Sequence, residues 1–175
     1  MTAQLKKKIN KIKVLAMDVD GVLTSGKINL DEEGKEIKSF NVYDGFGLAL
    51  CHKAGLKTAV ISARSSGAVT ARALDLKIDR IFQDAYPKIS AYEQILKDFD
   101  AQDADVCFIG DDLPDICVLK RVGLAVAVSN AVPEVQREAD YVTKKRGGDG
   151  ALREVIELIL KTQGKWEGLI KPLCI

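Results

Sequence analysis

Short apolar runs alternate with segments of helical periodicity along most of the chain. Runs such as IKVLAMD at 12–18 contain few polar positions, which is typical of strands buried on both faces of a parallel sheet. Between the runs, apolar residues recur at helical spacing, and Pro87 and Gly55 stand where one helix is expected to begin and another to end. Strands are expected at 12–18, 57–62, 80–82, 104–111, 124–128 and 141–143. Helices are expected at 45–55, 66–76, 87–99, 113–123, 132–139 and 150–161.

This order of elements predicts an α/β fold, a doubly wound, Rossmann-like parallel sheet with helices on both faces. Right-handed crossovers bring the carboxyl ends of all the strands to one edge of the sheet, where ligands bind in folds of this kind. One segment departs from the pattern. Two alternating arms around the turn DEEG predict a β-hairpin at about 26–40. Because it follows the first strand directly, we expect it to project over that same edge.

Length, composition and charge limit the possible classes of protein. The 175 residues are enough for one domain, which we expect at 1–162, with 163–175 as a C-terminal tail of no clear periodicity. A net charge of +1 gives no general reason to expect nucleic acid or an anionic membrane as a partner. The basic run at 6–13 is explained by the solvated face of a short helix.

Two further features concern the compartment. No apolar run approaches the ~20 residues that span a bilayer, and the first residues lack the apolar core of a signal peptide. None of the four cysteines forms a CxxC pair, which argues against a zinc site or a disulfide framework. We therefore expect a cytoplasmic protein with reduced thiols.

Polar residues gather at the ends of the predicted strands. Asp18 and Asp20 end the first strand, Ser62 ends the second, and Asp111 ends the strand at 104–111. Taken singly, each has a structural explanation, such as a turn at Asp20 or a helix cap at Ser62. Their joint occurrence at successive strand ends is harder to explain in that way. Lys88 adds a separate signal, because a cation in the first turn of a helix opposes the helix dipole.

Together these residue types suit one kind of chemistry. Carboxylates from two strands form a hard oxygen site for Mg²⁺, and the metal offsets the repulsion between Asp18 and Asp111. Lys88, the hydroxyl of Ser62 and the backbone N–H groups of the DVDG turn suit a phosphoryl group. One carboxylate can attack phosphorus to form an aspartyl-phosphate, and a second can protonate the leaving oxygen and later deprotonate water. The set predicts a Mg²⁺-dependent phosphomonoester hydrolase.

The motifs that carry these residues resemble those of a known family. DVDGVLT, ISAR, the downstream Lys88 and GDDLPD, in this order, resemble the four motifs of the haloacid dehalogenase superfamily of phosphatases. The resemblance covers roughly residues 12–162. The first and last motifs are highly specific as a pair, whereas ISAR and a single lysine are weak signals by themselves.

The resemblance implies a role for each matching residue. Asp18 would be the nucleophile and Asp20 the general acid and base. Mg²⁺ would be held by Asp18, the backbone carbonyl of Asp20, and Asp111. Ser62 and Lys88 would hold the phosphoryl group. Two more acidic residues of the last motif would support the metal through water or orient the lysine: Asp112 and Asp115.

A closer resemblance narrows the substrate. DGVLTSGKI, YDGFGL, ISARSS, GDDLPD and RGGDGALRE together resemble the capless members that act on 3-deoxy-D-manno-octulosonate 8-phosphate, a precursor of a lipopolysaccharide sugar. This resemblance implies a phosphorylated sugar acid as substrate. It also implies a homotetramer in which the hairpins assemble and a neighbouring subunit helps to close the site. Neither gap between the motifs is long enough for a cap domain.

Three residues are candidate substrate contacts. Arg64 follows Ser62, and its planar guanidinium matches a carboxylate or a phosphate. Arg146 precedes the GGDG segment, where it equally suits a solvated loop. Asp44 opens a predicted helix, so that capping is its default explanation and the resemblance adds a possible substrate contact.

The sequence departs from the family pattern at two positions, and two alternatives stay open. Ala63 stands where Gly is expected after the hydroxyl residue, and Asp84 stands where Gly is expected, which adds a carboxylate near Lys88. The motifs do not separate octulosonate 8-phosphates from nonulosonate 9-phosphates. A non-hydrolytic phospho-receiver module also combines acidic residues, a hydroxyl and a lysine, but it normally carries its acceptor aspartate on a middle strand.

The predicted hairpin also bears on assembly. Its arms carry four large apolar residues, more than a monomer is expected to leave in water. We therefore expect a homo-oligomer from this feature alone. The residues are Ile28, Leu30, Ile37 and Phe40.

Overall fold

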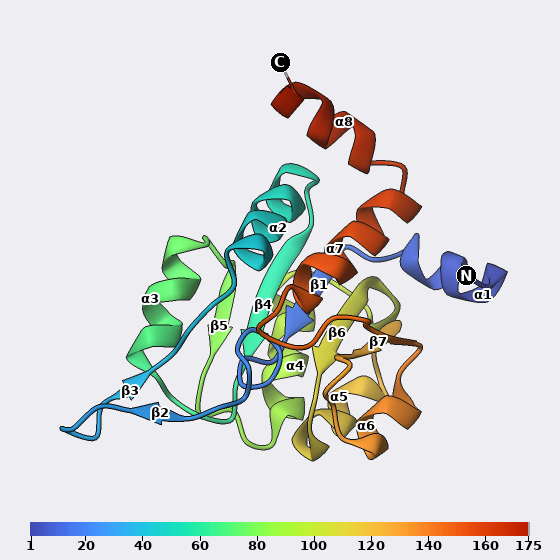
Figure 1. The fold of residues 1–175 in the computed structure, drawn as a ribbon. Coiled ribbons are helices and arrows are strands. Elements are labelled where there is room, and N and C mark those ends of the chain that lie inside the picture. Colours follow the sequence, from blue (N-terminus) through green and yellow to red (C-terminus); the bar gives the residue numbers. More distant parts are fainter. Residues whose placement is uncertain (175) are drawn as a thin grey trace.

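Six parallel strands form the central sheet, in the order β5-β4-β1-β6-β7-β8 (Figure 1). The computed structural model describes residues 1–174. Every strand expected from the apolar runs is present, which confirms the predicted doubly wound α/β fold. The bounds are β1 Val14–Met17, β4 Lys57–Ile61, β5 Arg80–Phe82, β6 Val106–Gly110, β7 Leu124–Ala127 and β8 Tyr141–Val142.

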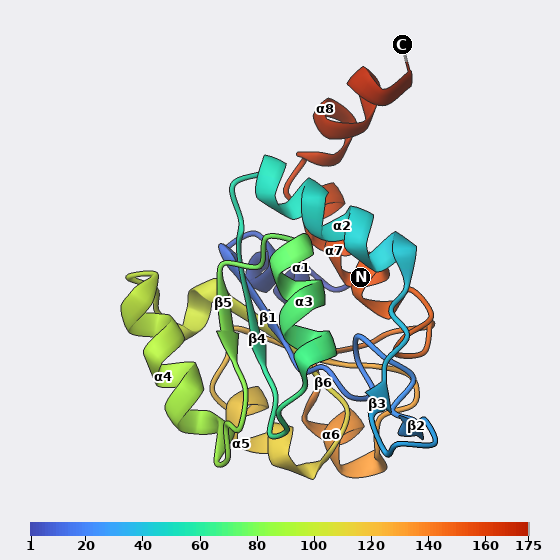
Figure 2. The ribbon, with the colours of Figure 1, turned by 90° about the vertical axis from the view of Figure 1, so that its left-hand side faces the viewer.

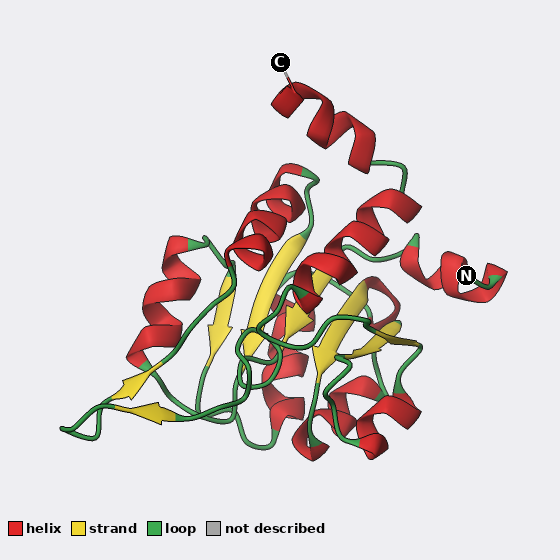
Figure 3. Cartoon of the chain, viewed as in Figure 1, coloured by secondary structure: helices red, strands yellow, loops and turns green. Residues whose placement is uncertain are grey.

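Helices cover both faces of the sheet (Figures 2 and 3). One face carries α2 (Val42–Lys53), α3 (Gly67–Asp75) and α7 (Ala151–Thr162), with α1 (Ala3–Ile9) against α7. The other face carries α4 (Lys88–Asp98), α5 (Ile116–Leu119) and α6 (Pro133–Glu138). Single 3₁₀ turns lie at η1 (Asp103–Asp105), η2 (Leu113–Asp115) and η3 (Lys171–Cys174). Within the described residues, every helix is too short or too polar to cross a bilayer.

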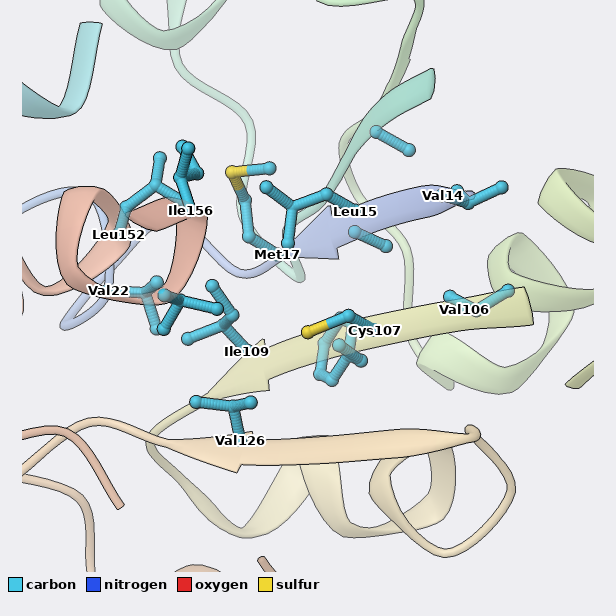
Figure 4. Close-up of a cluster of buried hydrophobic side chains, with 14 of the residues drawn as sticks. Val14, Leu15, Met17, Val22, Val106, Cys107, Ile109, Val126, Leu152 and Ile156 are labelled. Atoms are coloured by element: carbon cyan, nitrogen blue, oxygen red, sulfur yellow. The ribbon is translucent and has the colours of Figure 1, made fainter. Parts of the chain in front are cut away.

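The core lies between the central strands and α7. Apolar side chains of β1, β6 and β7 meet Leu152 and Ile156 of α7 (Figure 4). The large buried residues of this helix recur at the spacing of one helical face, so that a single stripe faces the sheet. Each contributes about 1.5–3 kcal/mol by leaving water. They are Leu152, Val155, Ile156, Ile159 and Leu160, all 0% exposed.

Between β1 and β4 the chain forms only the predicted hairpin and α2. The hairpin pairs β2 (Asn29–Leu30) with β3 (Glu36–Ile37) and projects from the edge of the sheet at which the strands end (Figures 1 and 2). Ile28, Leu30 and Ile37 are 59%, 62% and 54% exposed, whereas Phe40 packs against the core. A two-stranded hairpin is marginal alone, so its contacts with the body of the protein matter.

Two segments differ from the expectation. The helix expected at 113–123 is a 3₁₀ turn, η2, followed by a single turn of α-helix, α5. The cause is local: the Asp115 carboxylate turns back to accept the N–H groups of Asp111 and Asp112, which tightens the first turn.

The C-terminal tail, in which the sequence shows no clear periodicity, contains a short helix, α8 (Trp166–Ile170). The Trp166 ring is 9% exposed and stacks under two cations, with Arg153 at 5.3 Å and Lys161 at 4.9 Å from the ring centroid. Cation–π contacts and apolar burial therefore fasten α8 to α7.

Trp166→Ala is expected to release α8 without unfolding the sheet. Loss of the ring removes both cation–π contacts, and amide hydrogen exchange in α8 should rise by about tenfold or more while β1 keeps its protection. Exchange measured by mass spectrometry checks this, with the exposed Glu167→Gln as the matched control on the same helix. Equal exchange of α8 in the Trp166 variant and the parent would show that another contact holds the tail.

Candidate active site

Three carboxylates meet at the carboxyl ends of the two central strands. Asp18 follows β1 directly and Asp111 follows β6, and these strands are paired, so that their ends are adjacent. Asp115 joins them from η2. One carboxylate oxygen of each lies within 4.8 Å of the others. The backbone forces this proximity, since the N–H of Asp18 still donates to the carbonyl of Ile109 at 3.0 Å.

Lys88 lies among these carboxylates. Its ammonium is 2.8 Å from Asp18 Oδ1 and 2.6 Å from Asp115 Oδ1, and its side chain is 3% exposed. Burial alone would lower the pKa of Lys88, but the two carboxylates outweigh burial and raise it. The lysine is therefore charged, and it sits at the first residue of α4 against the helix dipole, as the sequence predicted.

One ammonium does not balance three carboxylates. Burial, and then repulsion from Asp115, raise the pKa of Asp18 even though Lys88 opposes the shift. Burial and both neighbouring carboxylates raise the pKa of Asp111 as well. Asp111 Oδ1 is buried and accepts no hydrogen bond from any described residue. The site therefore has too little positive charge to balance its carboxylates, and one carboxylate oxygen, Asp111 Oδ1, has no partner within the described part of the chain.

These features fit a divalent cation. The donors are carboxylate oxygens, which suit Mg²⁺, and the buried free oxygen of Asp111 is available for coordination. Asp115 is less available, because its Oδ1 binds Lys88 and its Oδ2 accepts the N–H groups of Asp111 and Asp112 at 2.9 and 3.2 Å. This arrangement supports Asp18 and Asp111 as the side-chain metal ligands and Asp115 as the residue that orients Lys88.

The turn after β1 leaves no room for a side chain at its glycine. Gly21 has φ +94°, and a Cβ there would lie 2.0 Å from Asp111 Oδ2. The hydroxyl of Thr24 accepts the N–H of Gly21 at 3.4 Å and of Gly26 at 3.3 Å, which closes the turn around Asp20. The glycine of DVDG is thus required by the close approach of the two acidic loops.

Asp20 does not point into the carboxylate cluster. Its side chain is 24% exposed and accepts a hydrogen bond from Lys38, a residue of the hairpin. Sequence reasoning missed Lys38, although a cation in a hairpin expected over the acidic edge was a usable signal.

Asp112 is exposed and caps η2 by accepting the N–H of Leu113 at 2.8 Å.

The remaining predicted residues lie around this centre. Ser62 follows β4, the strand that pairs with β1 on its other side, and its side chain is buried. Its Oγ accepts the N–H of Arg64 at 3.2 Å, and the guanidinium of Arg64 binds Glu36 of the hairpin at 2.9 Å. Asp84 is exposed at φ +52°, a left-handed conformation that explains why Gly is expected there.

Asp44 and Arg146 lie near the start of α7. Asp44 is buried in α2, and its Oδ1 accepts the N–H of Arg153 at 2.7 Å, so that it caps a helix that begins more than a hundred residues later. Its Oδ2 is buried with no partner in the part of the chain that the structure describes. Arg146 is exposed at the head of the GGDG segment.

That segment supports the turn after β1. A Cβ on Gly147 would lie 1.6 Å from the carbonyl oxygen of Gly21, and the N–H of Gly148 donates to Val22 at 3.0 Å. Asn130 joins the two loops, because its Nδ2 donates to the Gly21 carbonyl at 3.3 Å and its Oδ1 accepts the Gly147 N–H at 2.6 Å. Sequence reasoning missed Asn130, and no local pattern marks it.

Comparisons with known proteins agree with this arrangement. Residues 75–155 match a family described as haloacid dehalogenase-like hydrolase. The chain is 39% identical over 165 residues to the 3-deoxy-D-manno-octulosonate 8-phosphate phosphatase of Escherichia coli, which covers 94% of this chain and 88% of that protein. It is 41% identical over 157 residues to the phosphatase of the same name from Yersinia pestis, with 90% and 84% covered.

A solved structure is similar over almost the whole chain. It is the 3-deoxy-D-manno-octulosonate 8-phosphate phosphatase of Moraxella catarrhalis in complex with a magnesium ion, a phosphate ion and a KDO molecule. The TM-score is 0.96 at 38% sequence identity, and the match covers 99% of each chain.

Asp44→Asn is expected to change how stability depends on pH. Burial raises the pKa of Asp44 to about 6, although hydrogen bonds from the backbone of Arg153 and Gly150 oppose the shift. The native state therefore holds this proton more tightly than the unfolded chain does. The stabilisation is complete below about pH 4 and is lost as the pH rises through 6.

Urea unfolding of the wild type and the Asn variant at pH 4.5 and pH 7.5 measures this effect. Between the two pH values the wild type should lose on the order of 2 kcal/mol of unfolding free energy relative to the variant, which keeps the capping oxygen but cannot ionise. A difference between the two proteins that is the same at both pH values would contradict a raised pKa at Asp44.

Proposed function

We infer that this chain, which belongs to the 3-deoxy-D-manno-octulosonate 8-phosphate phosphatases of the haloacid dehalogenase-like hydrolases, is a Mg²⁺-dependent phosphomonoester hydrolase. Its substrate is the phosphorylated sugar acid of that name, an intermediate in the synthesis of a lipopolysaccharide sugar. The observation that carries this conclusion is the cluster of Asp18, Asp111 and Asp115 at the ends of β1 and β6, with Lys88 bound to two of the three carboxylates.

The proposed reaction proceeds in two displacements. Asp18 Oδ attacks phosphorus, the bond from phosphorus to the sugar oxygen breaks, and Asp20 gives that oxygen a proton. Asp20 then takes a proton from water, which attacks the aspartyl-phosphate and releases inorganic phosphate and free Asp18. Lys88 and the Ser62 hydroxyl hold the phosphoryl oxygens through both steps.

The metal has a defined place in this proposal. Asp18, Asp111 and the backbone carbonyl of Asp20 would hold Mg²⁺, with Asp112 contacting it through water. When bound, Mg²⁺ supplies the positive charge that the carboxylates lack and stabilises charge on the phosphoryl oxygens. Asp115 keeps Lys88 in position.

Three residues are proposed substrate contacts beyond the phosphoryl group. Arg64 lies two residues after Ser62, and its side chain is 44% exposed although its guanidinium also binds Glu36, so that a substrate carboxylate could still reach it. Arg146 is exposed beside the turn after β1. Asp44 has one oxygen committed to the α7 cap, so that any contact with substrate uses its free Oδ2.

Assembly and location stay predictions. The exposed Ile28, Leu30 and Ile37 of the hairpin support the proposed homotetramer, because such a patch is costly in water. The cytoplasmic location and the absence of nucleic-acid or membrane partners rest on the sequence.

Phosphate release from octulosonate 8-phosphate, with Mg²⁺ or with excess EDTA, tests the proposed activity. Turnover should require Mg²⁺, and Asp18→Asn should reduce it to background because the nucleophile is lost. Asp20→Asn should lower it about 10²–10⁴-fold. The control is Asp75→Asn on α3, whose side chain is 65% exposed and which should match the wild type.

Three outcomes separate the parts of this proposal. Full activity of the Asp18 variant would refute the aspartyl-phosphate mechanism. Full activity in EDTA would refute the metal requirement. A higher kcat/KM for a nonulosonate 9-phosphate than for octulosonate 8-phosphate would keep the hydrolase activity but refute the proposed substrate.

A further inference from the structure

Four alternating charges join the hairpin to the two loops that flank it. The Lys38 ammonium donates to the Asp20 carboxylate and lies 3.2 Å from Glu36 Oε1. The same oxygen of Glu36 lies 2.9 Å from the Arg64 guanidinium. The order along this chain is Asp20, Lys38, Glu36, Arg64. It runs from the turn after β1, through the hairpin, to the loop after β4.

Lys38 is the buried member of an exposed segment. Its side chain is 3% exposed, whereas Ile28, Leu30 and Ile37 of the same hairpin are each more than half exposed. An ammonium is withdrawn from water only where charged partners compensate for the loss of hydration. Lys38 has two such partners, one on each side. An exposed pair contributes little, but this pair is shielded, so the contact fixes the geometry of both groups.

Glu36 holds Lys38 in place. Burial alone would raise the pKa of Glu36, but Lys38 and Arg64 outweigh burial and hold it below its ordinary value. Glu36 is therefore a carboxylate, and it binds both cations through one oxygen. Since β2 and β3 are only two residues long, these ion pairs are among the contacts that attach the hairpin to the body of the protein.

The direction of the Asp20 side chain follows from this contact. The backbone of its turn is fixed by Gly21 and Thr24, but these contacts do not involve the Asp20 carboxylate. The carboxylate lies outside the cluster of Asp18, Asp111 and Asp115, on the side of the hairpin. A proton donor needs this placement: it must lie beside the phosphoryl site and reach the leaving oxygen rather than the metal.

We propose that Lys38 is a positioning residue, which holds the Asp20 carboxylate where the leaving sugar oxygen is protonated. The hairpin is then part of the catalytic apparatus, with Glu36 as the support of Lys38. This inference rests on the proposed phosphatase function.

The experiment compares two leaving groups. A sugar alkoxide is strongly basic and needs a proton as it leaves, whereas p-nitrophenolate leaves without one. kcat/KM covers substrate binding and the steps up to formation of the aspartyl-phosphate, so it excludes the hydrolysis of that intermediate. Lys38→Met should lower kcat/KM for octulosonate 8-phosphate by about 10–10²-fold, but that for p-nitrophenyl phosphate by no more than about threefold.

Matched variants separate positioning from general damage. Lys38→Arg should recover most of the loss because it keeps a cation at the same place. Lys35→Met, which removes an exposed lysine of the same hairpin, should match the wild type. In a double-mutant cycle, Lys38→Met should cause almost no further loss in a chain that already carries Asp20→Asn. Because Asp20 is 24% exposed, removal of Lys38 leaves no buried unpaired charge, and a thermal melt verifies that the variant is folded.

Each outcome bears on the proposal. Equal losses for both substrates, or losses that multiply with Asp20→Asn, would overturn the positioning role and leave the phosphatase proposal intact. Wild-type activity of Lys38→Met would do the same. A wild-type chain that hydrolyses neither phosphate ester would overturn the proposed function, and the role of Lys38 with it.

Discussion

The repulsion among three carboxylates at the ends of two paired strands is the constraint on which this structure depends. Hydrogen bonds between β1 and β6 fix Asp18 and Asp111 side by side, and η2 adds Asp115. Lys88 supplies one positive charge where at least two more are needed for balance. Burial makes the imbalance worse, because few water molecules can screen it. A divalent cation supplies the two missing positive charges. The metal and Lys88 together can then attract an anionic phosphoryl group, which is why metal binding and phosphate chemistry belong to one site.

Segments far apart in the sequence keep these repelling carboxylates in place. Gly21 and Gly110 admit the side chains of Asp111 and Asp115 at distances that a Cβ would block. The GGDG segment before α7 packs on the turn after β1, and Asn130 ties the two together. The hairpin contacts the same turn through Lys38, which donates to the Asp20 carboxylate. Glycines therefore allow the loops of the site to approach closely, and ion pairs of the hairpin hold the Asp20 side chain.

The sequence predicted the parts that depend on local pattern. Apolar periodicity located the strands, and parallel topology placed the residues after them at one edge, which brought Asp18, Asp111 and Lys88 together correctly. The missed features depend on side-chain contacts between distant segments. Lys38 meets a residue 18 positions away, and Asn130 one 109 positions away. The short η2–α5 unit and the anchoring of α8 also follow from single side chains, Asp115 and Trp166. The pattern of apolar residues does not show where these side chains point.

The central claim is that the acidic centre is a divalent-cation site, and calorimetric titration of the full chain with Mg²⁺ at pH 7.5 tests it most directly. The account predicts one Mg²⁺ bound per chain. It also predicts loss of that binding in Asp111→Ala, which removes the free buried oxygen, and retention in the exposed Asp75→Asn. A wild-type chain that binds no Mg²⁺, or an Asp111 variant that binds it as tightly as the wild type, would contradict the account.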